Sequence, residues 1–200
     1  MKRVFDLVIA AALLIALSPL FLAIALVILL TMGSPVFFRQ QRPGRGGRPF
    51  TLIKFRTMAV GASRPEDQRD EARRLTRVGT LLRATSLDEL PELVNVLRGE
   101  MSLVGPRPLL LEYLPLYTEE QARRHEVRPG ITGWAQVHGR NALPWEERFA
   151  MDVWYVDHRS FRLDLRILWL TLVQVARRSG VTQPGQVTAQ PFRGSGGGKS

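Results

Sequence analysis

Two adjacent carboxylates, Asp88 and Glu89, are the residues of this 200-residue chain whose type and position best suit covalent chemistry. They follow Ser86 and precede Pro91, where a helix is expected to begin. A carboxylate in a first helical turn is expected to have a lowered pKa, so Asp88 would be ionised at neutral pH. An ionised aspartate can attack phosphorus and form an acyl phosphate, while Glu89 points elsewhere around the helix and can hold Mg²⁺.

The same segment has a second interpretation, in which it performs no chemistry. Ser86 and Glu89 have the spacing of a capping box, in which the serine caps the helix and the glutamate bonds back to it. Asp88 would then only interact favourably with the helix dipole. The residues of this segment leave both interpretations open.

Cations that can balance phosphate charge are plentiful. The chain carries 28 Lys and Arg against 18 Asp and Glu, a formal net charge of +10, and nearly all of the cations are arginine. Arginine keeps its charge and grips phosphate through paired hydrogen bonds, which suits a nucleotide, a nucleic acid or an anionic membrane surface. The candidate phosphate partners are Arg83, Arg107, Arg128 and Arg140, although each alone also fits a surface position.

Cysteine is absent, which excludes disulfides, thiolate nucleophiles and cysteine-based zinc sites. That composition suits a protein of the cytosol. The three histidines, His125, His138 and His158, lack metal-ligand spacing and are interpreted as structural or surface residues.

The segment 7–30 carries no charge and is long enough to cross a bilayer. Pro19 removes a backbone hydrogen bond in its middle, so a kink is expected, and Ser18 can bond a carbonyl one turn back. Both flanks are basic, and basic flanks favour the cytoplasm. A re-entrant helix-break-helix that enters and leaves on the cytoplasmic face satisfies both features. A kinked single span is the alternative, and a cleaved signal peptide fits less well.

The remainder predicts a small α+β globule with a β-hairpin and several helices. Strands are expected at 36–40 and 50–55, around a Gly-rich loop. Apolar residues of the second strand share one face, and Lys54 and Arg56 share the other, where they present two cations.

Further elements follow from periodicity and capping signals. The apolar residues Leu90, Leu93, Val94 and Leu97 predict an amphipathic helix at 90–97 that ends at Gly99. The remaining predicted elements are a strand or extended segment at 101–104, a helix at 118–125, a turn into 131–137, a helix from Pro144 and a last helix at 161–178. The charged segment 62–74 is interpreted as a surface loop or solvated helix. The expected organisation is a membrane segment at 1–33, a catalytic domain at 34–180 and a flexible tail at 181–200.

The run LRATSLDELPELVNVLRGEMSLVGPRP at 82–108 closely resembles the bacterial sugar transferase family, the monotopic phosphoglycosyl transferases. KFRTM at 54–58 is similar to the basic strand motif of that family, and RPGITGWAQV at 128–137 is similar to a later segment. Ser18-Pro19 matches its helix break. Two departures are visible: His138 stands where the family usually has Asn, close to Arg140, and Glu92 where Gln is frequent.

The resemblance covers about residues 1–180 and implies a catalytic dyad in which Asp88 is the nucleophile. It also implies Mg²⁺, held through Glu89 and Asp88, a nucleotide-sugar donor and a polyprenyl phosphate acceptor. An aspartate from the C-terminal part is expected near the site, with Asp164 the first choice and Asp152 the second. The predicted substrate-binding residues are Lys54, Arg56, Arg83, Pro106, Arg107, Pro108, Arg128, Arg140 and Asp164.

The reaction expected from this resemblance begins when Asp88 attacks the β-phosphorus of a UDP-sugar and releases UMP. Polyprenyl (undecaprenyl) phosphate then accepts the phosphosugar, as the first membrane step of surface glycan or glycoprotein assembly. The enzyme would sit on the cytoplasmic face of the inner membrane, held by the re-entrant helix and interfacial amphipathic helices among the membrane lipids. Family analogy favours an N-acetylated sugar, and the absence of a further N-terminal membrane domain favours the short, single-domain form.

Two rival classes of protein fit the sequence less well. A membrane-tethered basic module could bind nucleic acid without catalysis, but the sequence has no nucleic-acid-binding motif or aromatic platform, so nucleic acid is not an expected partner. A polytopic transferase would need many hydrophobic spans, and only one long apolar run is present. Mg²⁺-dependent release of UMP from a UDP-sugar would discriminate the expected enzyme from the nucleic-acid-binding module. The sugar, the glycan pathway and the oligomeric state are not specified by the sequence.

Overall fold

The computed structural model describes residues 1–59, 74–139, 143–177 and 191–194. Within these ranges helices predominate and two small sheets are present, which confirms the predicted α+β class. The elements are α1 (Lys2–Ala16), α2 (Ser18–Met32), β1 (Phe37–Pro43), η1 (Arg45–Gly47), β2 (Pro49–Phe55), α4 (Arg77–Ala84), η2 (Leu87–Glu89), α5 (Glu92–Arg98), β3 (Ser102–Val104), η3 (Leu111–Leu116), α6 (Glu119–Ala122), η4 (Arg123–Glu126), β4 (Gly130–Thr132), α7 (Trp134–Val137), α8 (Trp145–His158) and α9 (Phe161–Arg177).

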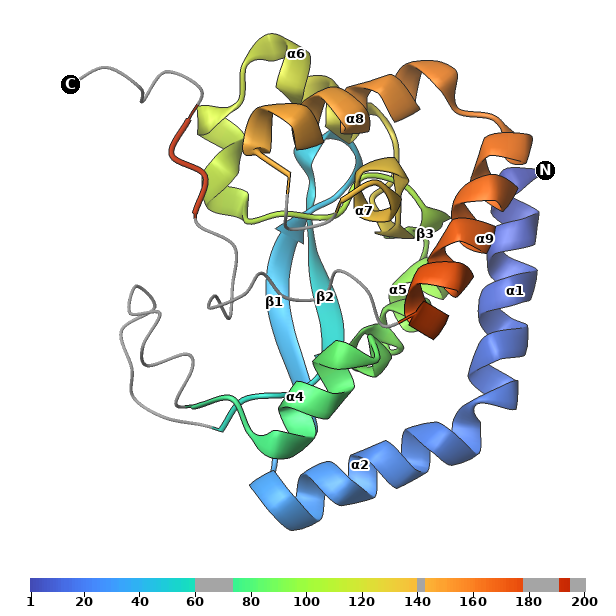
Figure 1. Ribbon diagram of the computed structural model, residues 1–200, viewed down its shortest axis with the longest axis vertical. Helices are drawn as coiled ribbons and strands as arrows, with labels where there is room; N and C mark the ends of the chain where they lie inside the picture. Colours follow the sequence, from blue (N-terminus) through green and yellow to red (C-terminus); the bar gives the residue numbers. More distant parts are fainter. Residues whose placement is uncertain (60–73, 140–142, 178–190, 195–200) are drawn as a thin grey trace.

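The predicted β-hairpin is confirmed and runs through the middle of the molecule (Figure 1). β1 and β2 pair antiparallel, with Phe38 opposite Lys54. Ile53 and Phe55 are buried, as the alternation predicted, and Phe55 packs against the ring of Phe21 in α2. The hairpin therefore connects the second apolar helix to the centre of the globule.

The second sheet brings together two glycine-containing sequence motifs. β3 pairs parallel to β4, and the segments after and before these strands pass in direct backbone contact. A Cβ on Gly105 would lie 2.3 Å from the carbonyl oxygen of Arg128, and one on Gly130 would lie 2.1 Å from the amide nitrogen of Gly105. A Cβ on Gly133 would lie 2.2 Å from the Gly105 oxygen. Only glycine permits this approach, which holds the Pro106–Pro108 segment against β4.

The apolar N-terminal segment forms two helices, α1 and α2, bent by 61° at the predicted break. Pro19 lies in the first turn of α2, and the Ser18 hydroxyl donates to the Ile15 carbonyl oxygen at 2.8 Å, as expected for a serine beside a broken helix. Among the described residues, no single helix has the length and apolar character to span a membrane; only this bent pair passes that test, and only as a pair.

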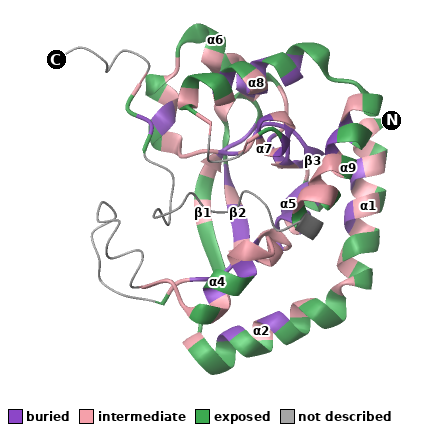
Figure 2. Cartoon of the chain, in the orientation of Figure 1, coloured by how far each residue is buried: buried purple, intermediate pink, exposed green. Residues whose placement is uncertain are grey.

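The two halves of the pair have different surroundings. α1 packs against α5 and β3, its Ala10 is fully buried, and Phe5 meets Phe161 of α9 edge to face at 5.1 Å. α1 and α9 thus lie side by side along one flank (Figure 1). α2 crosses the lower edge of the view and is largely exposed, with only Ile24 and Ile28 buried (Figure 2).

The helix predicted at 90–97 is present as α5, with Gly99 in the left-handed conformation directly after it, but its buried face differs from the prediction. Glu92 and Asn95 are buried beside Leu93 and Val96, whereas Leu97 is exposed. Asn95 explains the difference, because its side chain accepts from the Ile53 amide and donates to the Thr51 carbonyl. Polar residues on this face thus tie α5 to β2, which the apolar spacing did not indicate.

Most other predicted elements are confirmed. Thr118 and Gln121 form both bonds of a capping box, Pro144 directly precedes α8, and α9 occupies the predicted last helix. The segment predicted as a loop or solvated helix at 62–74 lies, apart from Arg74, outside the described residues, as does most of the predicted tail. The described part of that tail is not free, because Phe192 is buried against Phe149 and Tyr113.

Candidate active site

The carboxylate pair lies in a single 3₁₀ turn, η2, just before α5. Ser86 enters this turn in the left-handed conformation, with φ 57°, and its side chain makes no capping hydrogen bond. The capping-box interpretation of Ser86 and Glu89 is therefore wrong. A left-handed backbone is costly for a residue other than glycine, and such strain is found more often at functional sites than elsewhere.

Glu89 is the centre of an ion-pair cluster whose residues come from β2, η2, α5 and the Pro106–Pro108 segment. Its Oε1 accepts from Lys54 Nζ of β2 at 2.8 Å and from Arg107 Nη2 of the Pro106–Pro108 segment. Lys54 Nζ also lies 3.0 Å from Glu92 Oε1, so one cation joins two carboxylates. The cluster brings together a hairpin residue, a helix-start residue and a loop residue that are far apart in sequence.

Asp88 is buried, with 9% of its surface exposed, and its environment differs from that of Glu89. No described residue donates a hydrogen bond to its carboxylate. Burial, and secondarily the charge of Glu89, raise the pKa of Asp88 to about 6, against the opposing effect of Lys54 and Arg107. The lowered pKa predicted from the helix start is wrong for Asp88, because desolvation outweighs the nearby cations.

Glu89 shows the opposite shift. Burial alone would raise the pKa of Glu89, but Arg107 and then Lys54 outweigh it through charge and hydrogen bonds, so the pKa lies well below its ordinary value. Burial, moderated by Lys54, raises the pKa of Glu92 to about 7. Neighbouring carboxylates with divergent pKa values are typical of catalytic centres, where one group reacts and the other stays charged.

Other predicted site residues lie near this cluster. The Arg83 Nε donates to the Thr57 hydroxyl at 3.1 Å, and the charge of Arg83 acts on Asp88. Pro106 and Pro108 flank Arg107 in a shallow hollow. The residues that line it are Pro43, Pro106, Arg107, Pro108, Arg124, His125, Val127 and Pro129.

Arg56 does not share the environment of Lys54, which corrects the prediction of a two-cation strand face. It is buried, and its guanidinium donates to the Met32, Gly33 and Ser34 carbonyl oxygens at the C-terminus of α2. These carbonyls have no intrahelical partner, so a cation there is favourable. Arg56 thus attaches the C-terminus of α2 to the hairpin.

Three more predicted residues were expected to reach the substrate from later in the chain. Arg128 Nε donates to the Gly99 carbonyl oxygen at 2.8 Å, at the C-terminal end of α5. Arg140 lies outside the described residues. Asp152, the second choice for an aspartate near the site, is instead paired with Arg124, at 2.7 Å between Oδ2 and Nη2.

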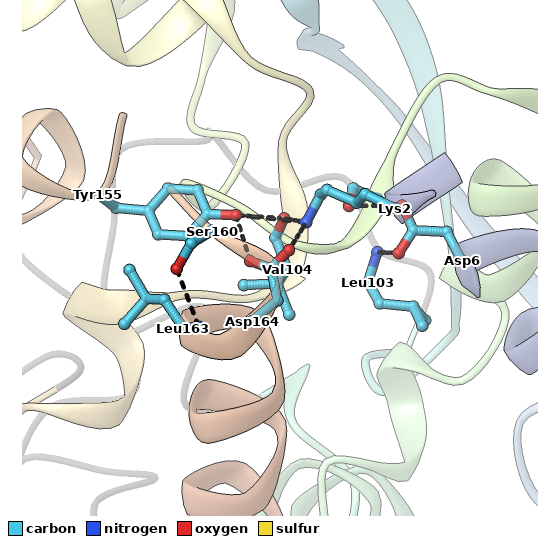
Figure 3. Close-up of polar contacts among 9 residues, drawn as sticks. Lys2, Asp6, Leu103, Val104, Tyr155, Ser160, Leu163 and Asp164 are labelled. Carbon is cyan, nitrogen blue, oxygen red and sulfur yellow. Dashed lines mark hydrogen bonds and ion pairs between the residues drawn. The ribbon is translucent and has the colours of Figure 1, made fainter. Parts of the chain in front are cut away.

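Asp164, the first choice, lies in a separate buried cluster (Figure 3). Its Oδ2 is 2.6 Å from Lys2 Nζ, and its Oδ1 accepts from the Tyr155 hydroxyl at 2.6 Å. Lys2 also donates to the Val104 carbonyl oxygen at 3.1 Å. The structure thus gives Asp164 the role of joining α1, α8, α9 and the end of β3, and shows it making no contact with the dyad.

Sequence reasoning missed two residues around the site, Glu92 and Arg124. Glu92 follows Glu89 by three residues, and that spacing places side chains on one helical face, so the sequence did contain a signal that Glu92 lies near the site. Arg124 had no such signal, because its partner Asp152 is distant in sequence.

The residues fit a magnesium ion only together with a substrate. No group of three metal-binding side chains occurs in the part of the chain that the structure describes. Mg²⁺ commonly uses one or two carboxylates and completes its shell with substrate phosphate and water. The Asp88 carboxylate, to which no described residue donates, and the second oxygen of Glu89 are suited to that use.

Comparison with known proteins gives the family. The model of the bacterial sugar transferases matches residues 1–178. The chain belongs to the bacterial sugar transferase family. A Bacillus subtilis protein described as "Uncharacterized sugar transferase EpsL" is 57% identical over 196 residues, which cover 98% of this chain and 97% of the relative.

Two further relatives carry names that state a reaction. A "UDP-glucose:undecaprenyl-phosphate glucose-1-phosphate transferase" of Caulobacter vibrioides is 46% identical over 183 residues, which cover 86% of this chain and 68% of the relative. A Xanthomonas campestris protein of the same description is 43% identical over 186 residues, 87% of this chain. The match spans 38% of that relative's length.

Proposed function

We propose that this sugar transferase moves a phosphosugar from a UDP-sugar to polyprenyl phosphate through a covalent intermediate on Asp88. One observation carries the proposal: Asp88 is a buried carboxylate that receives no hydrogen bond from the residues the structure describes, and it lies next to a glutamate held by Lys54 and Arg107. The names of the relatives support the substrate classes. UDP-glucose is the first donor to test, followed by UDP-galactose and N-acetylated UDP-sugars.

The first half-reaction uses Asp88 as nucleophile. A carboxylate oxygen of Asp88 attacks the β-phosphorus, the bond from that phosphorus to the oxygen bridging to the α-phosphate breaks, and UMP leaves with the electron pair. The phosphosugar remains on Asp88 as an acyl phosphate. Weak solvation of the Asp88 carboxylate keeps it reactive, since hydrogen-bond donors would have to be displaced before attack.

The surrounding cations stabilise charge during this step. Lys54 and Arg107 are fixed by Glu89 and present positive charge where the diphosphate must lie. Arg83 adds a third cation from α4. Magnesium bound by Asp88 and Glu89 would neutralise further phosphate charge.

The second half-reaction returns the enzyme to its starting state. An oxygen of polyprenyl phosphate attacks the phosphorus on Asp88, the acyl phosphate bond breaks, and the Asp88 carboxylate is released. The product is a polyprenyl diphosphate sugar, and the two halves together predict ping-pong kinetics.

The lipid acceptor requires the site to lie at a membrane, and we propose that the bent pair of α1 and α2 provides that attachment. The exposed side chains of α2 include Leu22, Leu26 and Leu30, and those of α9 include Trp169 and Leu172. Such a face is expected to insert into the cytoplasmic leaflet, with both ends of the pair on the cytoplasmic side.

Intact-protein mass spectrometry tests the chemistry directly. Incubation with donor alone should add the phosphosugar mass to the wild-type chain and release one equivalent of UMP, while Asp88→Asn should do neither. Normal turnover in the Asp88→Asn variant would overturn the proposal. Asp157→Asn, a change at an exposed ion pair, is the control and should form the adduct.

Thiol labelling tests the membrane arrangement, because the chain has no cysteine of its own. One cysteine is placed in a short extension ahead of Met1 and another replaces the exposed Gln41. Both should resist a membrane-impermeant reagent in intact cells and react after lysis. Labelling of the extension from outside would show a spanning helix, and Pro19→Ala should increase that population by restoring a straight helix.

A further inference from the structure

Arg124 and Asp152 form a buried ion pair beside the Pro106–Pro108 segment. Arg124 is 3% exposed and Asp152 is 4% exposed. The Arg124 Nε and Nη2 both donate to Asp152 Oδ2, at 3.1 and 2.7 Å. The aromatic rings of Tyr117 and Phe149 lie within 6 Å of the guanidinium, at 5.8 and 5.6 Å.

The same guanidinium reaches the active-site loop. Arg124 Nη2 donates to the Arg107 carbonyl oxygen at 2.8 Å. The neighbouring Pro106 carbonyl oxygen accepts from the Gly130 amide at 3.0 Å. Two consecutive carbonyls of the loop are therefore held from outside it, and the Arg107 side chain extends from between these fixed points to Glu89.

A buried ion pair contributes little net stability compared with apolar residues of the same size, because desolvation offsets the attraction. The Arg124–Asp152 pair instead fixes the direction of the Arg107 carbonyl group. The prolines at 106 and 108 have no N–H to anchor the loop themselves, so the anchor has to come from another element.

We propose that Arg124, held by Asp152, is a positioning residue that sets the Arg107 guanidinium against Glu89 and the donor diphosphate. This inference rests on the proposed function for its effect on turnover. Its structural part, the pinning of the loop, does not depend on which reaction the site performs.

The decisive variant is Arg124→Lys, which keeps the charge but cannot donate through a planar fork to both Asp152 and the Arg107 carbonyl. UMP release in the first half-reaction should fall about 10- to 100-fold, because small displacements of a catalytic group have effects of this size. Arg123→Lys is the matched control: Arg123 precedes it in the chain but pairs at the surface with Glu120, Glu126 and Asp157, and the rate should stay within about twofold.

A double-mutant cycle with Arg107→Met separates positioning from a general effect on folding. If Arg124 acts through Arg107, the double variant should release UMP as fast as Arg107→Met alone, within about threefold. Fully additive losses would overturn the proposal, as would an Arg107→Met variant with wild-type rates. Asp152→Asn replaces Arg124→Lys in the cycle if the lysine variant does not fold.

Hydrogen exchange supplies a readout that needs no turnover. Backbone amides in 102–110 should exchange at least about tenfold faster in Arg124→Lys and at the wild-type rate in Arg123→Lys. Unchanged exchange in Arg124→Lys would overturn the pinning of the loop. Faster exchange in a protein that releases no UMP from any UDP-sugar would instead leave the pinning in place and reject the proposed function.

Discussion

Asp88 and Asp164 are both buried aspartates, yet their surroundings differ in one decisive respect. Asp164 has a partner for each oxygen, Lys2 and the Tyr155 hydroxyl (Figure 3). Asp88 has nearby cations but no hydrogen-bond donor within the part of the chain that the structure describes. A buried carboxylate without donors is costly to the folded state, whereas one with donors stabilises a defined packing.

Under the proposed function, this contrast distinguishes a reactive carboxylate, Asp88, from a structural one, Asp164. The site keeps Asp88 poorly solvated and places the donors on Glu89 instead, so two neighbours in sequence have opposite pKa shifts. The unfavourable burial of the Asp88 carboxylate lowers the stability of the folded protein, which is a known cost of catalytic centres.

The largest expected effect comes from Asp88→Asn. UMP release should fall at least ~1,000-fold, as for the loss of a nucleophile, while thermal stability rises. A pKa raised from 3.8 to about 6 corresponds to roughly 3 kcal/mol lost on ionising Asp88 in the folded protein. The melting temperature should rise by several degrees, since 1 kcal/mol is about 2–4 °C for this size. Calorimetry at pH 7.5 measures the shift, and a lower melting temperature would contradict the contrast.

Glu89→Gln should have the next largest effect. Lys54 and Arg107 would lose their shared anion, and UMP release should fall about 100-fold. The Mg²⁺ concentration for half-maximal rate should rise, because one carboxylate is removed. A titration of Mg²⁺ measures both, with the exposed Glu119→Gln as control. Full wild-type activity in a chelator would reject the role of magnesium.

The pH dependence of the first half-reaction follows from Asp88. Only the ionised carboxylate attacks, so the rate should fall about tenfold per pH unit below about pH 6. Stability has the opposite sign: the folded state binds the Asp88 proton more tightly than the unfolded chain. The stability that protonated Asp88 contributes to the folded state is complete below about pH 4 and is lost as pH rises through about 6. The difference in melting temperature between the wild type and Asp88→Asn, measured as a function of pH, isolates the contribution of Asp88. A difference that does not change with pH would contradict the raised pKa.

The smallest expected effect on turnover is that of Asp164→Asn. Loss of the charged partner of Lys2 should destabilise the fold by about 1–2 kcal/mol, while UMP release at 25 °C stays within about threefold. Denaturant unfolding and the UMP assay give the two values. A large loss of turnover without a change in stability would instead return Asp164 to the active site.

Local signals predicted most of the fold. The hairpin, the capping box at Thr118, the stop at Gly99 and the break at Pro19 each depend on residues close in sequence, and all are present. The buried face of α5 was not predicted, because Asn95 is held by contacts with β2 rather than by apolar periodicity.

The candidate site was predicted in part. The structure brings Glu89, Lys54 and Arg107 into contact, as the grouping of these residues in one predicted site implies. Arg56 and Arg128 instead bind backbone carbonyls, which no sequence pattern identifies in advance. The raised pKa of Asp88 could not be predicted from the sequence either, because it depends on how deeply the fold buries the carboxylate and on how close it brings Glu89.

The way α1 is built into the globule decides how this protein can be handled. If the bent pair enters the membrane as proposed, a fragment beginning after Met32 would be the obvious route to an enzyme that needs no detergent. It would also delete Asp6, which accepts from the Ser102 hydroxyl at 2.8 Å, and Lys2, the partner of Asp164. Such a fragment would uncover apolar surface along β3 and α5 and is expected to aggregate. Replacing the exposed leucines of α2 with polar residues, while keeping α1 intact, is the sounder route to a soluble variant.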